Sequence, residues 1–200
     1  MLLKYTWQLL SNPRRAWVNI RDDNCSISRC YFSYLMILAA IAPIAGFIGT
    51  TTIGWSIGQG DPTYLSPKSA FFIAIIYYFA MLTNVFILGM TVRWMGKTYG
   101  CDISLTQGIK LATYTATPIL LIGIVELYPT LWVNFVIGLP ALGYTIYLLY
   151  IGVPIVLKMS ETKGFLLSSA LVAMGLVSLV SLLGAMAFFW DWGFAPQFVD

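Results

Sequence analysis

Five stretches of this 200-residue chain contain no Asp, Glu, Lys or Arg, and they constrain the fold more than any other feature. They cover residues 34–55, 69–92, 111–125, 131–157 and 165–190. Because an α-helix of about 20 apolar residues crosses the roughly 30 Å hydrocarbon core of a bilayer, these stretches predict an all-α polytopic membrane protein with five transmembrane helices. The third stretch is short, so its flanking residues must help to complete the span.

The composition supports this class and narrows the chemistry. Apolar residues make up 59% of the chain and charged residues 10%, against roughly 45–50% and 25% in soluble domains, which excludes a water-soluble globule. The chain has no histidine, which removes the usual general base near neutral pH and most metal sites. Cys25, Cys30 and Cys101 match no zinc or disulfide pattern and are expected to be free thiols. We therefore expect no enzyme activity, no cofactor and no metal.

Positive charge is concentrated in alternate loops. Ten of the eleven Lys and Arg residues fall in residues 1–33 and in the connections 93–110 and 158–164, whereas Lys68 is alone on the other side. Because short loops rich in Lys and Arg stay in the cytoplasm, the N-terminus should lie inside and the C-terminus outside. We expect the basic inner face to meet membrane lipids, and no nucleic-acid partner is implied.

The chain divides into a cytoplasmic arm at 1–33, a transmembrane domain at 34–190 and a short outer tail at 191–200. On a helical wheel the start of the arm separates an apolar arc from a polar side, with Leu2, Leu3, Trp7, Leu9 and Leu10 opposite Lys4, Tyr5 and Gln8. Asn12-Pro13 ends this helix, and Arg14 and Arg15 follow in a position suited to anionic headgroups. The pattern predicts an N-terminal amphipathic interfacial helix; an unordered terminus is the alternative.

A few polar residues interrupt the spans and are the candidate ligand contacts. Thr113 and Thr117 share a helix face, and Pro118 deprives the carbonyl of Tyr114 of its helical partner, which predicts a polar notch in the third span. Repair of the proline kink by the threonines is the favoured role of this notch, and ligand binding is the alternative. The remaining candidates are Asn84, Tyr144 and Glu126, and Glu126 is expected near the outer headgroups.

Several short motifs along the chain resemble a known family. They are Asn12-Pro13-Arg14, Phe47-Ile48-Gly49-Thr50-Thr51, Ile53-Gly54-Trp55, Tyr114-Thr115-Ala116-Thr117-Pro118 and Tyr147-Leu148-Leu149-Tyr150-Ile151-Gly152-Val153-Pro154. Together they resemble the YIP family (Ypt-interacting protein domain), particularly its bacterial inner-membrane members. The resemblance implies a compact five-helix domain in the cell inner membrane, with no known catalytic chemistry and no family functional residue to place on this chain.

Two functional hypotheses follow. The first is a non-enzymatic membrane protein that binds lipids, protein partners or further copies of itself through its basic inner face, as a scaffold or organiser of the membrane. The second is a transporter or channel for a small solute or ion that uses the Thr113–Pro118 notch, Asn84 and Glu126. The absence of an ionisable residue from the middle of any span favours the first.

Overall fold

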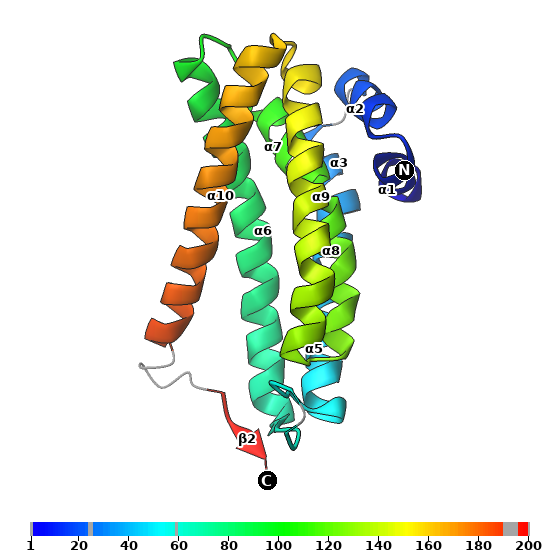
Figure 1. Cartoon of the computed structure of the whole chain (residues 1–200), viewed down its shortest axis with the longest axis vertical. Coiled ribbons are helices and arrows are strands. Elements are labelled where there is room, and N and C mark those ends of the chain that lie inside the picture. Colours follow the sequence, from blue (N-terminus) through cyan, green and yellow to red (C-terminus); the bar gives the residue numbers. More distant parts are fainter. Residues whose placement is uncertain (1, 24–25, 59, 190–195, 200) are drawn as a thin grey trace.

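The structure is a computed structural model that describes residues 2–23, 26–58, 60–189 and 196–199. It is built almost wholly from helices. In chain order they are α1 (Leu2–Ser11), α2 (Pro13–Asp22), α3 (Ile27–Cys30), η1 (Tyr31–Leu35), α4 (Met36–Ala39), α5 (Ile41–Ile48), η2 (Gly49–Ile53), α6 (Pro67–Thr98), α7 (Leu105–Thr115), α8 (Thr117–Ile122), η3 (Gly123–Leu127), α9 (Leu131–Leu157) and α10 (Glu161–Phe189). Figure 1 shows the longest of them lying side by side along the molecule.

Among the described residues, three helical segments are long and apolar enough to cross a membrane, namely Ile27–Ile53, Pro67–Thr98 and Leu131–Leu157. The first begins before the predicted boundary at residue 34 and contains two π-helical turns, Tyr31–Leu35 and Gly49–Ile53. These observations confirm an all-α membrane protein. The fourth predicted span, 131–157, is one uninterrupted helix with Pro140 and Pro154 inside it.

The third predicted span is a bent pair of helices. Leu105–Thr115 and Thr117–Leu127 meet at 41°, and together they would make a fourth crossing. The bend falls at Ala116, two residues before Pro118, as expected where a proline removes a helical hydrogen bond. The helix pair extends beyond the charge-free run 111–125 at both ends. It begins at Leu105, with Ser104 as the N-cap of α7, and it ends at Leu127.

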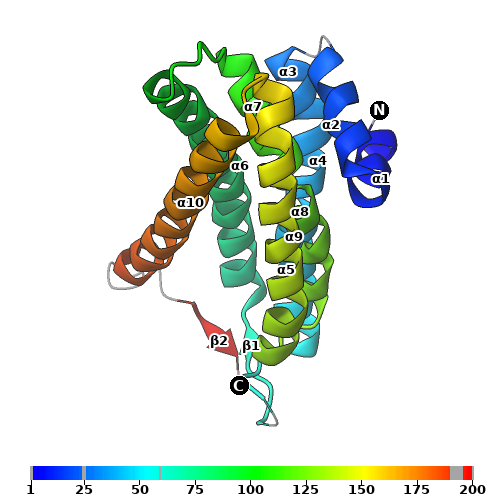
Figure 2. The same ribbon diagram turned by 45° about the horizontal axis from the view of Figure 1, so that its top comes forward.

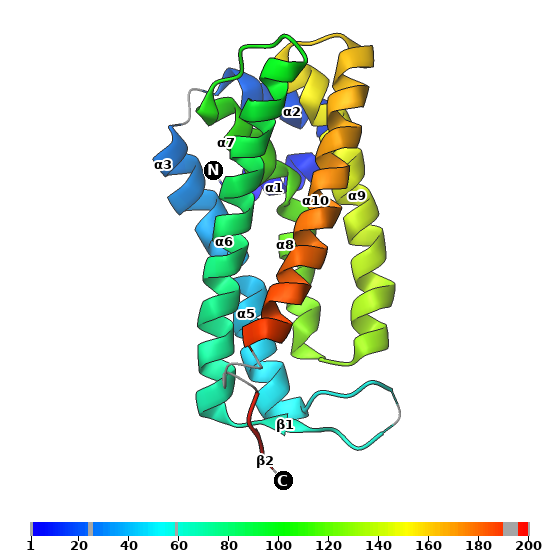
Figure 3. The same ribbon diagram turned by 90° about the vertical axis from the view of Figure 1, so that its left-hand side faces the viewer.

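The connections α6–α7 and α9–α10 and the helix α2 gather at one end of the bundle, which we call the basic end (Figures 1 and 2). The opposite end carries residues 54–58, 60–66 and 196–199 (Figure 3). There Tyr64–Leu65 (β1) pairs antiparallel with Phe198–Val199 (β2), a two-stranded sheet that the sequence did not predict. The loops therefore alternate between the two ends as the charge pattern required.

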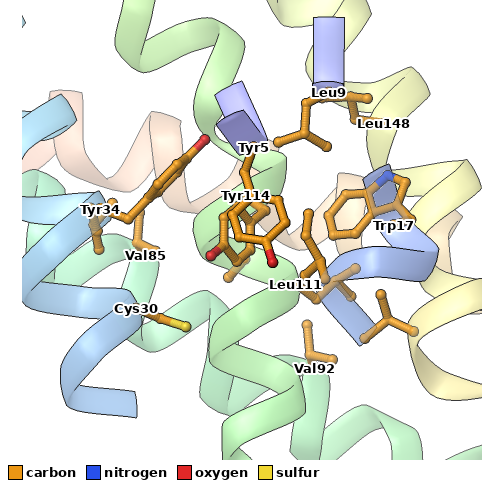
Figure 4. Packing of buried hydrophobic residues seen from close by; sticks show 14 of the residues in the cluster. Tyr5, Leu9, Trp17, Cys30, Tyr34, Val85, Val92, Leu111, Tyr114 and Leu148 are labelled. Atoms are coloured by element: carbon orange, nitrogen blue, oxygen red, sulfur yellow. The ribbon is translucent and has the colours of Figure 1, made fainter. Parts of the chain in front are cut away.

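The described residues of the N-terminal arm pack against the bundle. Its buried side chains belong to the main core together with residues of α4, α7 and α9 (Figure 4). Trp17 fits against Gly152 of α9, where a Cβ atom would lie 2.6 Å from the indole ring. Glycine is required at this position because any side chain would overlap the ring.

The predicted apolar arc of α1 divides between two environments. Trp7 is 71% exposed and Leu10 43%, but Leu9 is fully buried in the protein, and Tyr5, assigned to the polar side, is buried with it. The side chains of Leu2 and Leu3 lie outside the described residues. The prediction of a single lipid-facing arc was therefore wrong for Leu9 and Tyr5, because a helical wheel cannot distinguish burial in lipid from burial against another helix.

The expectation that all three cysteines are free thiols was also wrong. Cys101 is free, as predicted, but Cys30 is disulfide-bonded in the structure. Cys25 lies outside the described residues. Cys30 is buried at the start of the first long helical segment, close to the basic end.

Candidate functional site

At the predicted notch in the third span, the backbone carbonyl that Pro118 frees is satisfied from within the helix pair. The Thr117 hydroxyl donates a 2.8 Å hydrogen bond to the carbonyl of Tyr114, and it also lies 2.9 Å from the Tyr34 hydroxyl. Thr117 is fully buried. The threonine therefore repairs the gap that Pro118 opens in the helix, which is the favoured of the two predicted roles.

Three tyrosines close the notch (Figure 4). The ring of Tyr114 lies 4.6 Å from that of Tyr34 and meets the ring of Tyr5 edge-on at 5.6 Å, measured between centroids. Such pairs stabilise a core beyond their buried area, by about 0.5–1.5 kcal/mol each. Because Tyr5 belongs to α1, the arm packs against this cluster.

Two polar side chains fasten the arm to the bundle. The Tyr144 hydroxyl donates to the carbonyls of Leu9 at 2.8 Å and Leu10 at 3.2 Å, which are among the carbonyls left open at the end of α1. The Lys110 ammonium donates to the carbonyl of Asp23, the C-cap of α2. We call Tyr144 and Lys110 the arm latch. Tyr144, a candidate ligand contact, thus serves α1.

The arm carries one perturbed group of its own. The Tyr5 hydroxyl donates a 2.7 Å hydrogen bond to the carboxylate of Asp23. Burial of the ring, together with this bond and the neighbouring negative charge, raises the pKa of Tyr5 to about 12. Tyr5 therefore remains a hydrogen-bond donor throughout the physiological range.

The structure does not bring the other candidates into one site. Thr113 is fully buried and, among the described residues, its hydroxyl has no hydrogen-bond partner. Asn84 is half-buried on α6 and makes no side-chain hydrogen bond within the described part of the chain. A solute pathway needs polar groups that share water-accessible space. Thr113, Thr117, Asn84 and Tyr144 do not provide this, so the arrangement gives no support to the transporter hypothesis.

Glu126 occupies a different place, toward the opposite end of the bundle. Its Oε1 accepts a 2.8 Å hydrogen bond from the Tyr77 hydroxyl. Tyr77 is nine residues along α6 from Lys68, or about 14 Å of helix. The sequence predicts Glu126 near the outer headgroups, and in the structure its carboxylate, carried by the 3₁₀ turn η3, lies against α6.

Glu126 and Tyr77 border two adjoining hollows of about 420 and 380 Å³. Both hollows are also bordered by Gly46, Thr50 and Trp55, and most of the remaining wall is apolar. In the described part of the chain, no Lys or Arg lies within ion-pair distance of Glu126. The sequence suggested Glu126 but not Tyr77, since a tyrosine in an apolar run carries no local signal of its partner.

The basic end presents its charges to the surroundings. Arg14 and Arg15 are exposed at the start of α2, which Asn12 caps through its side chain. Six further cations at this end are exposed, namely Lys4, Arg29, Arg93, Lys97, Lys158 and Lys163. Arg21 pairs with Asp22 at 2.7 Å, and Lys110 is buried in the arm latch.

Comparison with known proteins agrees with this architecture. A Yip1 domain model matches residues 7–182. The chain is 37% identical over 192 residues to the inner membrane protein YohC of Escherichia coli strain K12, and to its counterpart in E. coli O6:H1, covering 96% of this chain and 98% of each relative. No solved structure matches significantly. The match extends from α1 into α10, so the arm and the bundle are parts of one domain, and the chain belongs to the Yip1 family.

Proposed function

We propose that this chain is a non-enzymatic protein of the bacterial inner membrane that binds anionic lipid headgroups or a protein partner through its basic end. The observation that best supports this proposal is the distribution of exposed cations. Eight lie at the basic end, whereas Lys68 lies at the opposite end. On an anionic leaflet each such cation contributes about 1 kcal/mol of attraction. The inner-membrane location is proposed from the similarity to the two E. coli inner membrane proteins.

The proposal includes five spans with the N-terminus in the cytoplasm. Four are the three long segments and the bent pair, and α10 would be the fifth, since 29 residues measure about 44 Å. The ten-to-one ratio of Lys and Arg between the two ends supports this orientation. The arm would then lie in the inner interface, with Trp7 and Leu10 toward lipid.

The lack of histidine supports a non-enzymatic role, because no nucleophile can be matched with the usual general base. The closure of the notch by Tyr5, Tyr34 and Tyr114 supports a binding role in preference to transport. The arm is then a fixed part of the surface that a lipid or partner meets.

Lipid retention in native mass spectrometry tests the proposal. The full-length protein in maltoside micelles, supplied with phosphatidylglycerol, should retain this lipid, and the double variant Arg14→Gln/Arg15→Gln should bind it roughly tenfold or more weakly, given about 1 kcal/mol per arginine. The matched control is Lys68→Gln at the opposite end, which should retain as much lipid as the wild type. Equal retention by all three proteins would contradict lipid binding through the arm.

A further inference from the structure

We propose that Glu126 and Tyr77 form a binding site for an ammonium group carried on an apolar chain. The site lies toward the opposite end from the arm and is independent of the function proposed above. It is built from three separate helices, because Gly46 belongs to α5, Tyr77 to α6 and Glu126 to η3.

The charge of the site selects a cation. Tyr77 satisfies only Oε1 of Glu126, and Oε2 accepts no hydrogen bond from the described residues. A carboxylate among apolar walls is stabilised most by a partner of opposite charge that also donates hydrogen bonds. Within the described chain no side chain supplies that partner, so a ligand can.

The walls of the site suit an alkylammonium group in particular. Trp55 and Tyr77 border both hollows, and aromatic faces attract ammonium groups. The remaining wall of the larger hollow is mostly apolar and includes Ala42, Met81 and Ile119. A hollow of about 420 Å³ falls within the range of about 300–1,000 Å³ that holds small ligands. A hydrated metal ion would gain little from such walls.

Glycine keeps the carboxylate accessible. A Cβ atom on Gly46 would lie 2.9 Å from Oε2 of Glu126, so a larger residue would displace the oxygen that is left open. Gly138 of α9 borders the larger hollow, and a Cβ atom there would meet nothing within 4 Å. A bulky side chain at position 138 can therefore fill the hollow without overlapping the protein.

Two kinds of molecule carry an ammonium group on an apolar chain, namely a phospholipid with an ethanolamine headgroup and a free amphipathic amine. Neither hollow is bordered by Lys or Arg, so a lipid phosphate would find no cationic partner among the described residues there. The experiment therefore includes both sources.

Calorimetric titration of the full-length protein in maltoside micelles, which contain no amine, tests the site. Dodecylammonium should bind saturably, and dodecanol, of the same chain length but uncharged, at least about tenfold more weakly. Glu126→Gln keeps the hydrogen bond from Tyr77 but removes the charge, and should lose at least about tenfold in affinity. Glu161→Gln, an exposed glutamate at the basic end, is the matched control and should bind as the wild type.

A second pair of variants keeps the carboxylate. Gly138→Leu should abolish dodecylammonium binding, whereas Gly143→Leu, on the same helix and equally unobstructed, should leave it unchanged. Equal affinity for dodecylammonium and dodecanol, or wild-type affinity in Glu126→Gln or Gly138→Leu, would overturn the proposal. This second pair decides the matter if Glu126→Gln fails to fold.

Native mass spectrometry distinguishes the sources. Preferential retention of phosphatidylethanolamine over phosphatidylglycerol, lost in Glu126→Gln, identifies a lipid ligand. Binding of dodecylammonium without that preference identifies a free amine. Absence of both overturns the site.

Discussion

The Thr117 hydroxyl donates to the carbonyl of Tyr114 at 2.8 Å, and this is the carbonyl that Pro118 deprives of its helical donor. In a membrane no water replaces a missing partner, so the hydroxyl is needed where the helix bends. The same oxygen also contacts Tyr34 of the first helical segment at 2.9 Å. A local repair of the backbone is thus tied to contact between two spans.

Removing this hydroxyl should destabilise the protein. We expect Thr117→Val to lower the free energy of unfolding by about 1–3 kcal/mol, because it leaves the carbonyl of Tyr114 unsatisfied in a buried position. Thr117→Ser should restore most of the loss. Thermal unfolding in micelles measures both.

The control for this variant is Thr145→Val in α9. The Thr145 hydroxyl bonds to the carbonyl of Ala141 inside an uninterrupted helix, where the backbone donor remains. Its loss should cost little. A loss for Thr145→Val as large as for Thr117→Val would show that the proline repair has no special importance.

The arm latch should govern local opening of α1. Tyr144→Phe removes the donor to the carbonyls of Leu9 and Leu10, so deuterium uptake by residues 2–11 should rise by roughly fivefold, equivalent to about 1 kcal/mol. The melting temperature of the bundle should change little. Tyr147→Phe, whose exposed hydroxyl has no hydrogen bond in the described chain, is the matched control. Equal uptake in both variants would contradict the latch.

Tyr5 should make the arm sensitive to alkaline pH. Its pKa is raised from 10.0 to about 12, so the folded arm holds this proton more tightly than the unfolded arm. The stabilisation is therefore complete below the ordinary pKa of 10.0 and is lost as pH rises toward 12. The tyrosinate absorbance of wild type minus Tyr5→Phe should show one group titrating near the raised pKa. A midpoint at the ordinary value would contradict burial of the arm.

The features predicted from the sequence were those with local causes. Charge-free length indicated the spans, and Pro118 indicated the bend. The docking of the arm could not be predicted, because Tyr144 and Leu9 are 135 residues apart and neither has an unusual neighbourhood in the sequence. The partner of Glu126 was missed for the same reason, since Tyr77 lies 49 residues away.

The orientation of the chain can be tested with reporter fusions. The ten-to-one charge ratio predicts that the basic end lies in the cytoplasm and the C-terminus outside. A reporter fused after Asp200 should therefore be active only if it requires the outer compartment. Activity of a cytoplasmic reporter at that position would reverse the orientation.

The contacts of the arm impose an order on biosynthesis. Leu9 and Trp17 leave the ribosome first, but they are covered by Leu148 and Gly152, which emerge more than a hundred residues later. Until α9 has been inserted, the arm lacks its packing partners on that helix, and its later-buried residues remain in the membrane interface. A nascent chain truncated before residue 131 should therefore display an undocked arm, and closure of the arm would mark the moment at which the bundle is complete.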